Sequence, residues 1–197
     1  VSAESASEKK NKLNMAWRNA KQLLALINQL LDLSKLESGK ASLRGKSDDI
    51  IPLFKTLTGS FESLAAQRGI ELQFHAETEQ AVVYFDTEKI EKIIHNLVSN
   101  ALKFTKSGGK VTVRVKRVEM PLSAKGDQDG AGTETDGSLE LTVHDTGIGI
   151  PADQLERVFD RFHQVDGTRT RQFEGTGIGL SLTKELVELH QGSISVE

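Results

Sequence analysis

Apolar residues in the N-terminal part of the chain recur with the period of a helix. Leu13, Ala20, Ile27 and the polar Ser34 are spaced by seven, and apolar residues at positions 16, 23 and 30 fill the complementary places of a heptad repeat. No glycine or proline interrupts the stretch from Glu8 to Leu36. This spacing predicts one long helix whose seam packs in a bundle or coiled coil, with packing on its own globular domain as the alternative. The seam is widened by Trp17, Leu24 and Leu31.

Beyond residue 46 the pattern alternates between the helical period and the period of two that is typical of strands. Residues 47–66 are predicted to form a helix that Ser47 or Asp48 caps and that holds Pro52 in its first turn. Asp86 is the expected cap of a helix over 87–104. Further helices are expected over 151–162 and 176–190, and strands over 70–75, 81–85, 110–118, 138–144 and 193–196.

The order of these elements indicates the fold class. Helices and strands joined by hairpin-type connections predict an α+β fold, a two-layer sandwich in which helices cover one face of a mixed sheet, preceded by one long stalk helix. Residues 119–137 are rich in Gly, Asp, Thr and Ser and are expected to form an exposed, mobile insertion between two strands. We assign no chemistry to this insertion.

Composition narrows the class of protein. The chain has 197 residues, a formal net charge of -3 and a pI near 6.0, which favour one folded core and argue against nucleic-acid or membrane-surface binding. No apolar run approaches the roughly 20 residues of a membrane span. The lack of cysteine excludes disulfides and thiolate metal sites and fits a cytoplasmic compartment. Because the sequence starts without Met and stops inside an expected strand, we interpret it as a fragment of a longer protein, whose own membrane anchoring stays open.

An asparagine-bearing helix precedes two glycine-rich segments. Asn96 and Asn100 lie four residues apart, so their amides share one face of the expected helix with Lys103 on the next turn. Amide oxygens can complete the shell of a Mg²⁺ ion beside phosphate oxygens, and a lysine neutralises phosphate charge. The polar face of an amphipathic helix explains any one of these residues alone, but it explains the group less well.

The first glycine segment follows an expected strand, whereas the second precedes an expected helix. Asp145 directly follows an expected strand, and there its carboxylate can accept the amino proton of adenine. Gly147 and Gly149 let the backbone turn tightly against a base. The second segment, Gly175-Thr-Gly-Ile-Gly-Leu180, precedes a helix, whose first backbone amides form a ready anion site. It lacks the Gly-Lys-Ser/Thr of a P-loop and the glycine spacing of a dinucleotide-binding turn.

These motifs, with Val158-Phe-Asp-Arg-Phe162 between them, resemble the nucleotide-binding boxes of the ATPase superfamily shared by gyrase, the heat-shock chaperone, sensor histidine kinases and mismatch-repair proteins. The motif sequences are most similar to those of the sensor histidine kinases, in particular the large hybrid ones. The resemblance implies ATP and Mg²⁺ as ligands, Asn100 as the Mg²⁺ ligand, and a lid over about 163–174 that Phe159 and Phe162 anchor. The residues that it implies around ATP are Asn96, Asn100, Lys103, Phe104 (stacked on adenine), Asp145, Gly147, Gly149, Arg161 (on a phosphate or on the stalk), Gly175, Thr176, Gly177, Gly179 and Leu180.

The resemblance also divides the chain. The run from Asn28 to Gly39 looks like the end of the second helix of a histidine-kinase dimerisation hairpin. Residues 1–41 are therefore expected to be part of that hairpin, and residues 42–197 the catalytic ATP-binding domain. Two features of the family are missing, the last sheet strand and a phosphoacceptor histidine. The five histidines lie at positions 75, 95, 144, 163 and 190, none of them on the stalk.

The function implied by the resemblance is transfer of the γ-phosphoryl group of Mg·ATP to a histidine on the absent first hairpin helix, of the same or the partner protomer. The group would then pass to the receiver domain of a response regulator, and the full-length protein is expected to be a homodimer. Asn96 stands where the hydrolytic relatives carry a water-activating Glu, and an amide is not a useful base at neutral pH, which favours transfer over hydrolysis. A nucleotide-binding scaffold without turnover and a gyrase-like ATPase are the alternatives.

Overall fold

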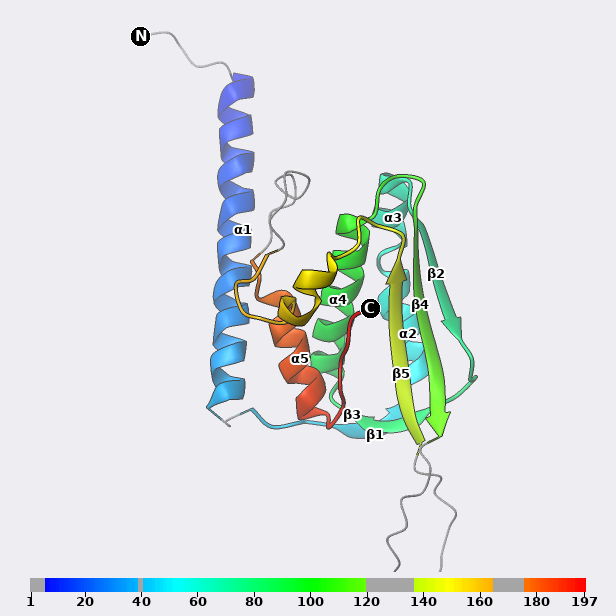
Figure 1. Cartoon of the computed structure of the whole chain (residues 1–197). Helices are drawn as coiled ribbons and strands as arrows, with labels where there is room; N and C mark the ends of the chain where they lie inside the picture. Colours follow the sequence, from blue (N-terminus) through cyan, green and yellow to red (C-terminus); the bar gives the residue numbers. More distant parts are fainter. Residues whose placement is uncertain (1–5, 39–40, 120–136, 165–175) are drawn as a thin grey trace, which may run out of the picture. The chain divides into compact units, whose positions relative to one another are not determined.

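The structure, a computed structural model, describes residues 6–38, 41–119, 137–164 and 176–197 (Figure 1). The chain forms two compact units, one of residues 43–151 and the other of residues 1–42 together with 152–197. These compact units are defined by the contacts between their residues. The predicted division into a partial hairpin helix (1–41) and a catalytic domain (42–197) rests on the family resemblance instead, and it stays a prediction.

Residues 43–151 contain a three-stranded mixed sheet. Its strands are β2 (Glu71–Ala76), β4 (Lys110–Glu119) and β5 (Gly137–Asp145), in the order β2-β4-β5. β2 runs parallel to β4 and β5 runs antiparallel to it, with Phe74, Val113 and Val143 in register. The strands predicted over 70–75, 81–85, 110–118 and 138–144 are all found, with ends that differ by at most one residue.

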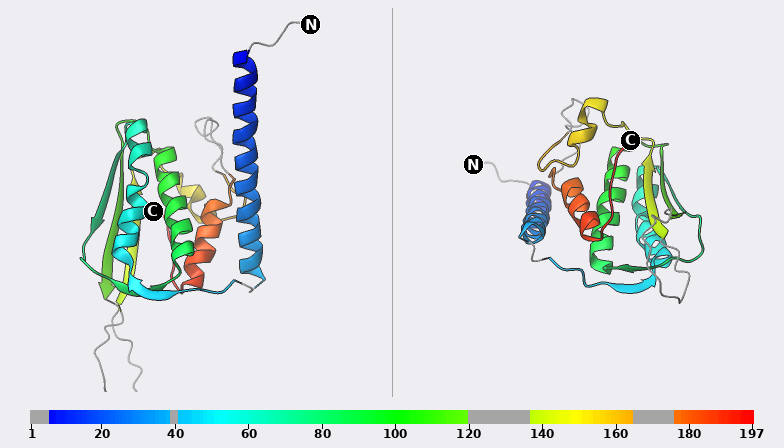
Figure 2. Two further views of the ribbon diagram at one scale, coloured as in Figure 1. Left: turned by 180° about the vertical axis from the view of Figure 1, so that it is seen from behind. Right: turned by 60° about the horizontal axis from the view of Figure 1, so that its bottom comes forward.

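Helices cover one face of this sheet (Figures 1 and 2). They are α2 (Ile50–Gly59), α3 (Glu62–Arg68) and α4 (Thr87–Phe104). Ile94, Val98 and Leu102 form one stripe of α4 and are fully buried, as are Val113 and Val115 of β4. These side chains belong to one apolar core between the helices and the sheet. The predicted two-layer α+β sandwich with a mixed sheet is thereby confirmed.

The polar residues before α2 form a strand that the sequence did not predict. β1 (Lys46–Asp49) pairs antiparallel with β3 (Val82–Phe85) in a separate two-stranded sheet. Its last residue, Asp49, caps α2 by accepting a hydrogen bond from a backbone amide two residues later (3.2 Å), so the predicted caps Ser47 and Asp48 are wrong. β1 shows no alternation of apolar and polar residues, because its pairing with β3 rather than its burial holds it in place.

The single helix predicted over residues 47–66 is interrupted. α2 ends at Gly59, and a turn at Ser60 and Phe61 separates it from α3. The Ser60 hydroxyl donates to the backbone carbonyl of Leu57 (2.6 Å). Glycine disfavours the helix, and a serine that bonds to a nearby carbonyl competes with the helical hydrogen-bond pattern. The break therefore has a local cause that the apolar periodicity concealed.

The other unit joins the N-terminal helix to the C-terminal part of the chain. α1 (Ala6–Glu37) contacts α5 (Gly179–Leu189), and the short 3-10 helix η1 (Ala152–Arg157) belongs to the same unit. Leu33 is 2% exposed, and it shares one stripe of α1 with the half-buried side chains at positions 26, 29 and 36. α1 is therefore covered along this stripe, near its C-terminal end.

The predicted seam of α1 is a different stripe, and it is exposed. Trp17, Leu23 and Leu30 are 62%, 59% and 51% exposed. The long helix itself is confirmed and extends from Ala6 to Glu37. Packing of the seam in a bundle stays a prediction. None of the described helices combines the length and the apolar character needed to cross a membrane.

Some expectations for the C-terminal part are wrong in detail. The helix predicted from Pro151 to Phe162 is limited to η1, and the helix predicted from Thr176 starts only at Gly179, because residues 176–178 form a turn. Residues 193–196 pair with none of the described strands. Their side chains alternate between half-buried and exposed, which is typical of an extended segment, but a strand also needs a neighbour that supplies hydrogen bonds. Nearly all of the predicted insertion, residues 120–136, lies outside the described residues.

Candidate functional site

The asparagine-bearing face of α4 lies in the C-terminal half of that helix. Asn96, Asn100 and Lys103 are all half-buried, in agreement with the shared face that their spacing predicted. The side-chain amide of Asn100 makes no hydrogen bond to another described residue. No described residue therefore competes with a ligand for this amide oxygen.

Lys103 is a half-buried cation. Its ammonium lies 4.6 Å from the centre of the Phe104 ring, which is a cation–π contact. Burial lowers the pKa of Lys103 below the usual value of a lysine, and no described carboxylate opposes that shift. An anionic ligand would offset the cost of burying this charge.

The first glycine segment lies against the C-terminal end of α4. The backbone amide of Ile148 donates to the carbonyl oxygen of Phe104 (3.3 Å). A Cβ atom added at Gly147 would lie 2.6 Å from the same carbonyl oxygen, so only glycine fits there. Gly149 has open space around it, but its φ of +68° is one that other residues rarely adopt. One glycine thus permits the close approach and the other permits the turn.

Asp145 and Thr146 order the same segment. The Oδ1 atom of Asp145 accepts a hydrogen bond from the Gly147 amide (2.8 Å), which leaves Oδ2 outside that turn. The Thr146 hydroxyl accepts a hydrogen bond from the Lys110 amide (2.9 Å), and the Thr146 amide donates to the Lys110 carbonyl (3.0 Å). The first glycine segment is therefore held by backbone groups of α4 and β4.

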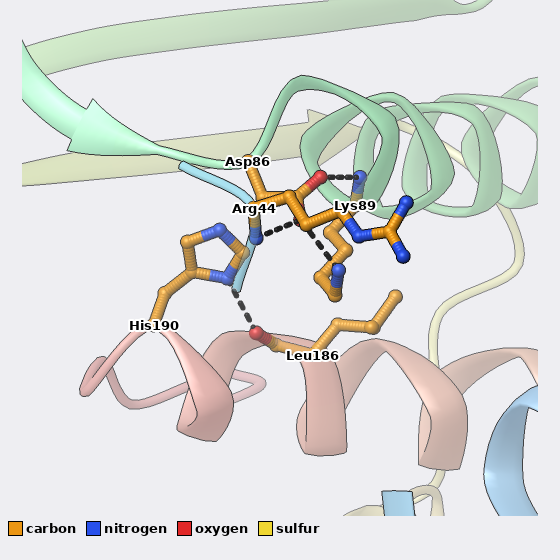
Figure 3. A network of polar contacts seen from close by, with 5 residues as sticks. All are labelled: Arg44, Asp86, Lys89, Leu186 and His190. Atoms are coloured by element: carbon orange, nitrogen blue, oxygen red, sulfur yellow. Dashed lines mark hydrogen bonds and ion pairs between the residues drawn. The ribbon is translucent and has the colours of Figure 1, made fainter. Parts of the chain in front are cut away.

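A buried carboxylate holds the N-terminus of α4 (Figure 3). Asp86 is 3% exposed and accepts hydrogen bonds from the backbone amides of Arg44 (2.8 Å) and Lys89 (3.3 Å) and from the Lys89 ammonium. Burial alone would raise the pKa of the Asp86 carboxyl, but these donors outweigh burial and hold the pKa below its usual value. The sequence predicted the cap, but it gave no sign that Asp86 also accepts a hydrogen bond from the backbone amide of Arg44.

The second glycine segment is described from Thr176 onward and belongs to the other unit. Gly177 has a φ of +68°, and a Cβ atom there would lie 2.6 Å from the carbonyl carbon of Phe162. The Phe162 amide donates to the Gly177 carbonyl (2.8 Å), and Phe162 itself has a φ of +60°. Because the Phe162 side chain is 64% exposed, this residue holds the turn through its backbone and not through a buried ring. Gly175 and residues 165–174 of the predicted lid lie outside the described residues.

The Thr176 hydroxyl has two partners within this unit. It accepts a hydrogen bond from the Ile178 amide (3.2 Å) and donates one to the Oε1 atom of Gln29 on α1 (3.1 Å). Ile178 is 1% exposed and is the N-cap residue of α5, a position from which no side chain caps the helix. The sequence did not suggest Gln29, because the heptad pattern assigned α1 to packing alone.

Arg161, another predicted site residue of this unit, contacts α5. Arg161 forms an ion pair with Glu185 of α5 (3.6 Å), a partner that the sequence did not suggest. At the other end of α5, the Nδ1 atom of His190 donates to the Leu186 carbonyl (2.7 Å; Figure 3), and because a carbonyl only accepts, Nδ1 carries the proton. This bond satisfies a helix-terminal carbonyl, so His190 has a structural role.

The structure thus groups the predicted site residues in two sets. One set lies in the unit of residues 43–151 and comprises Asn96, Asn100, Lys103, Phe104, Asp145, Gly147 and Gly149. The other set lies in the unit that contains α1 and comprises Arg161, Thr176, Gly177, Gly179 and Leu180. Among the described residues, no three or more His, Asp and Glu side chains gather as a metal site would require.

Comparison with known proteins places these features in a family. The family model described as "Histidine kinase-, DNA gyrase B-, and HSP90-like ATPase" matches residues 85–197, more than half of the chain. Hybrid signal transduction histidine kinase D of Dictyostelium discoideum is 36% identical over 184 residues, which cover 93% of this chain and 11% of the relative. The chain therefore spans about a tenth of that relative's length.

Solved structures show the same fold. Full-length ShkA in complex with AMPPNP has a TM-score of 0.75 and 22% identity, and the match covers 100% of this chain and 37% of that one. Histidine kinase ThkA in complex with the response regulator protein TrrA has a TM-score of 0.68 and 19% identity, with 99% of this chain and 49% of that chain covered. The histidine-kinase ATPase fold predicted from the sequence is thereby confirmed.

Proposed function

Because the chain belongs to the histidine kinase-, DNA gyrase B- and HSP90-like ATPase family, we propose that it binds Mg·ATP and acts as the catalytic domain of a sensor histidine kinase. The contact between α4 and the first glycine segment carries the proposal. There the Ile148 amide bonds to the Phe104 carbonyl (3.3 Å) and Gly147 has no room for a side chain. This contact joins the helix that bears an amide oxygen, an ammonium and an aromatic ring to the segment that begins with a carboxylate.

The adenine end of ATP is assigned to Asp145 and Phe104. The Oδ2 atom of Asp145 is outside the turn that Oδ1 stabilises, so it can accept the amino proton of adenine. Guanine carries a carbonyl oxygen at the equivalent place, which would repel the carboxylate. The ring of Phe104 is half-buried and offers a face for stacking.

The phosphate end is assigned to α4 and to the second glycine segment. The Asn100 oxygen suits Mg²⁺, which prefers oxygen ligands and keeps most of its shell for phosphate oxygens and water. When bound, Mg²⁺ would offset charge on the transferring phosphoryl group. Lys103 supplies a half-buried positive charge, and Asn96 offers a second amide on the same face. The backbone amides that begin α5, with Thr176, Gly177, Gly179 and Leu180, are assigned to the phosphates by the family resemblance.

The reaction that we propose is phosphoryl transfer to histidine. The bond between the γ-phosphorus and the ADP oxygen breaks while a bond from phosphorus to an imidazole nitrogen forms. Asn96 cannot activate water as a carboxylate would, which favours transfer over hydrolysis. No histidine lies on α1, so the acceptor belongs to a helix outside this sequence, in the same or the partner protomer of a homodimer. Relay to the receiver domain of a response regulator completes the proposal, and a solved structure of ThkA contains a response regulator protein, TrrA.

Binding is tested by calorimetric titration of Mg·ATP into this chain and into its Asp145→Asn variant. We expect ATP to bind and GTP not to bind, and we expect the substitution to weaken ATP binding about 10- to 100-fold, because it removes a charged acceptor. Glu140→Gln, which neutralises an exposed carboxylate on the same strand, is the matched control and should not change binding. Equal affinity for ATP and GTP would contradict the assignment of Asp145.

Transfer is tested on the protein extended by its upstream helix. Incubation with γ-labelled ATP should give acid-labile label on a histidine of that helix, and Asn100→Ala should abolish the labelling. ATP binding without any labelled histidine would favour a nucleotide-binding scaffold instead. Steady-state release of inorganic phosphate by the present chain would favour a gyrase-like ATPase.

A further inference from the structure

The Thr176 hydroxyl links the stalk helix to the second glycine segment. It donates its proton to the Oε1 atom of Gln29 (3.1 Å) while its oxygen accepts the Ile178 amide (3.2 Å). All three residues belong to one compact unit. The hydrogen bond that Thr176 donates to Gln29 therefore connects α1 to a segment that we assign to ATP phosphates.

Because a hydroxyl has only one proton, Thr176 can donate a hydrogen bond to only one acceptor at a time. While Thr176 donates to Gln29, it cannot donate to a phosphate oxygen. The Ile178 amide, a second donor of the turn, is also occupied because it donates to Thr176. In this arrangement two donors that an anion would need are bound within the protein.

The position of Gln29 on α1 keeps this arrangement in place. Gln29 is half-buried and lies on the same stripe as Leu33, which is 2% exposed. Ile178, directly after the turn, is 1% exposed. Any rotation or axial shift of α1 that moves Leu33 out of its packing would also withdraw Gln29 from Thr176.

We propose that Gln29 competes with the phosphates of ATP for the Thr176 hydroxyl, so that the stalk helix regulates nucleotide affinity through one hydrogen bond. This inference rests on the proposed function. Engagement of Gln29 opposes nucleotide binding, and nucleotide binding releases Gln29, because coupling between two binding events is reciprocal. A signal that shifts α1 would then change the affinity for ATP without contact with the nucleotide.

The competition predicts effects of opposite sign for two substitutions at one position. Gln29→Ala removes the competing acceptor, so Mg·ATP should bind about two- to tenfold more tightly, the range expected for one lost hydrogen bond. Gln29→Glu supplies a stronger acceptor and a negative charge, so Mg·ATP should bind more weakly. A purely structural role of Gln29 would weaken binding in both variants, and that result would overturn the proposal.

Controls separate the phosphate effect from other causes. Asn28→Ala removes an exposed neighbouring amide and should leave the affinity unchanged. Adenosine, which has no phosphate, should bind equally well to the parent chain and to Gln29→Ala. Thr176→Ser keeps the hydroxyl and should keep the response to Gln29→Ala, whereas Thr176→Val should remove that response.

The outcomes also separate this inference from the proposed function. If the parent chain fails to bind Mg·ATP, the proposed function fails and this inference fails with it. If the parent chain binds Mg·ATP but Gln29→Ala binds no more tightly, only the competition is wrong. The same applies if the gain with Gln29→Ala is equally large for adenosine.

Discussion

The two glycine segments share the sequence Thr-Gly-Ile-Gly, yet the protein holds them in different ways. In the first, Thr146 bonds to Lys110 of a sheet strand, and the segment lies against a helix C-terminus at Phe104. In the second, Thr176 bonds to Gln29, which is 147 residues away in the sequence, and the segment precedes a helix. The threonine hydroxyl therefore contacts a strand backbone in the first segment and a side chain of the stalk helix in the second.

The glycines of the two segments are required for different structural reasons. In the first segment Gly147 provides the close approach and Gly149 provides the positive φ. In the second segment Gly177 has to satisfy both conditions, because its φ is +68° and the Phe162 backbone lies 2.6 Å from a Cβ position. A shared motif therefore does not imply a shared reason for each glycine. Substitutions in both segments test whether these differences in contact have energetic consequences.

The largest contrast should come from alanine at the positive-φ glycines. Gly177→Ala should lower the free energy of unfolding by about 3 kcal/mol, because a left-handed residue costs about 1–2 kcal/mol and the contact with Phe162 adds overpacking. Gly149→Ala should cost only about 1 kcal/mol, because nothing lies within 4 Å of its Cβ position. Urea unfolding of both variants measures the difference. Equal losses would mean that the close approach at Gly177 relaxes freely.

The N-termini of α4 and α5, the helices next to the two segments, should differ in how strongly acid destabilises them. Asp86 caps α4 and its pKa is lowered, whereas no side chain caps α5 at its N-terminus. The ionised carboxylate therefore stabilises the folded protein above its ordinary pKa of 3.8, and this contribution is lost as the pH falls through the lower folded pKa. Asp86→Ala should cost about 2 kcal/mol at neutral pH, because it leaves a helix N-terminus and the Arg44 amide without their acceptor.

The measurement is denaturant unfolding of the parent chain and of Asp86→Asn across the acid range. The parent should lose stability more steeply toward low pH than the variant, which has no carboxyl group to titrate at this position. Asp48→Asn is the comparison variant: the pKa of Asp48 is also lowered, but this carboxylate is exposed, so solvent screens its interactions and its substitution should change the acid profile less. Identical acid profiles for the parent and Asp86→Asn would show that Asp86 is not the group that responds.

The cations near the two segments should contribute unequally to nucleotide binding. Lys103→Met should weaken Mg·ATP binding about tenfold, because a partly buried charge that no described carboxylate pairs with interacts strongly with phosphate. Arg161→Met should weaken it about twofold or less, because Arg161 already pairs with Glu185. Calorimetric titration compares the two variants. A larger loss with Arg161→Met would indicate that this ion pair opens when ATP binds.

The smallest expected contrast concerns the two threonines. Thr176→Val should cost about 1 kcal/mol of stability, because the Ile178 amide loses its acceptor in a half-buried turn. Thr146→Val should cost about 0.5 kcal/mol or less, because Thr146 is exposed and water can replace its hydroxyl at the Lys110 amide. Thermal unfolding of both variants provides the test, and a larger loss at Thr146 would contradict the comparison.

Much of the fold was predictable because its signals are local. α4 was predicted to the residue, since Asp86 caps its start and an apolar stripe continues to Phe104. The strands of the sheet were predicted within one residue from their alternation. β1 was missed, because its four polar residues are held by pairing with β3 and not by a pattern of their own. The break at Ser60 was missed because apolar spacing continued through it.

Most of the helices and strands, the positions of the glycines and the family resemblance could be inferred from the sequence alone, because periodicity, capping and turn chemistry act between near neighbours in the chain. The contacts that each of these residues makes became known only from the folded structure. It assigned Phe104 to Gly147, Arg44 to Asp86 and Gln29 to Thr176. Each of these contacts joins residues that are more than forty positions apart. Periodicity marks which face of an element is buried, but it does not identify the distant element that covers that face.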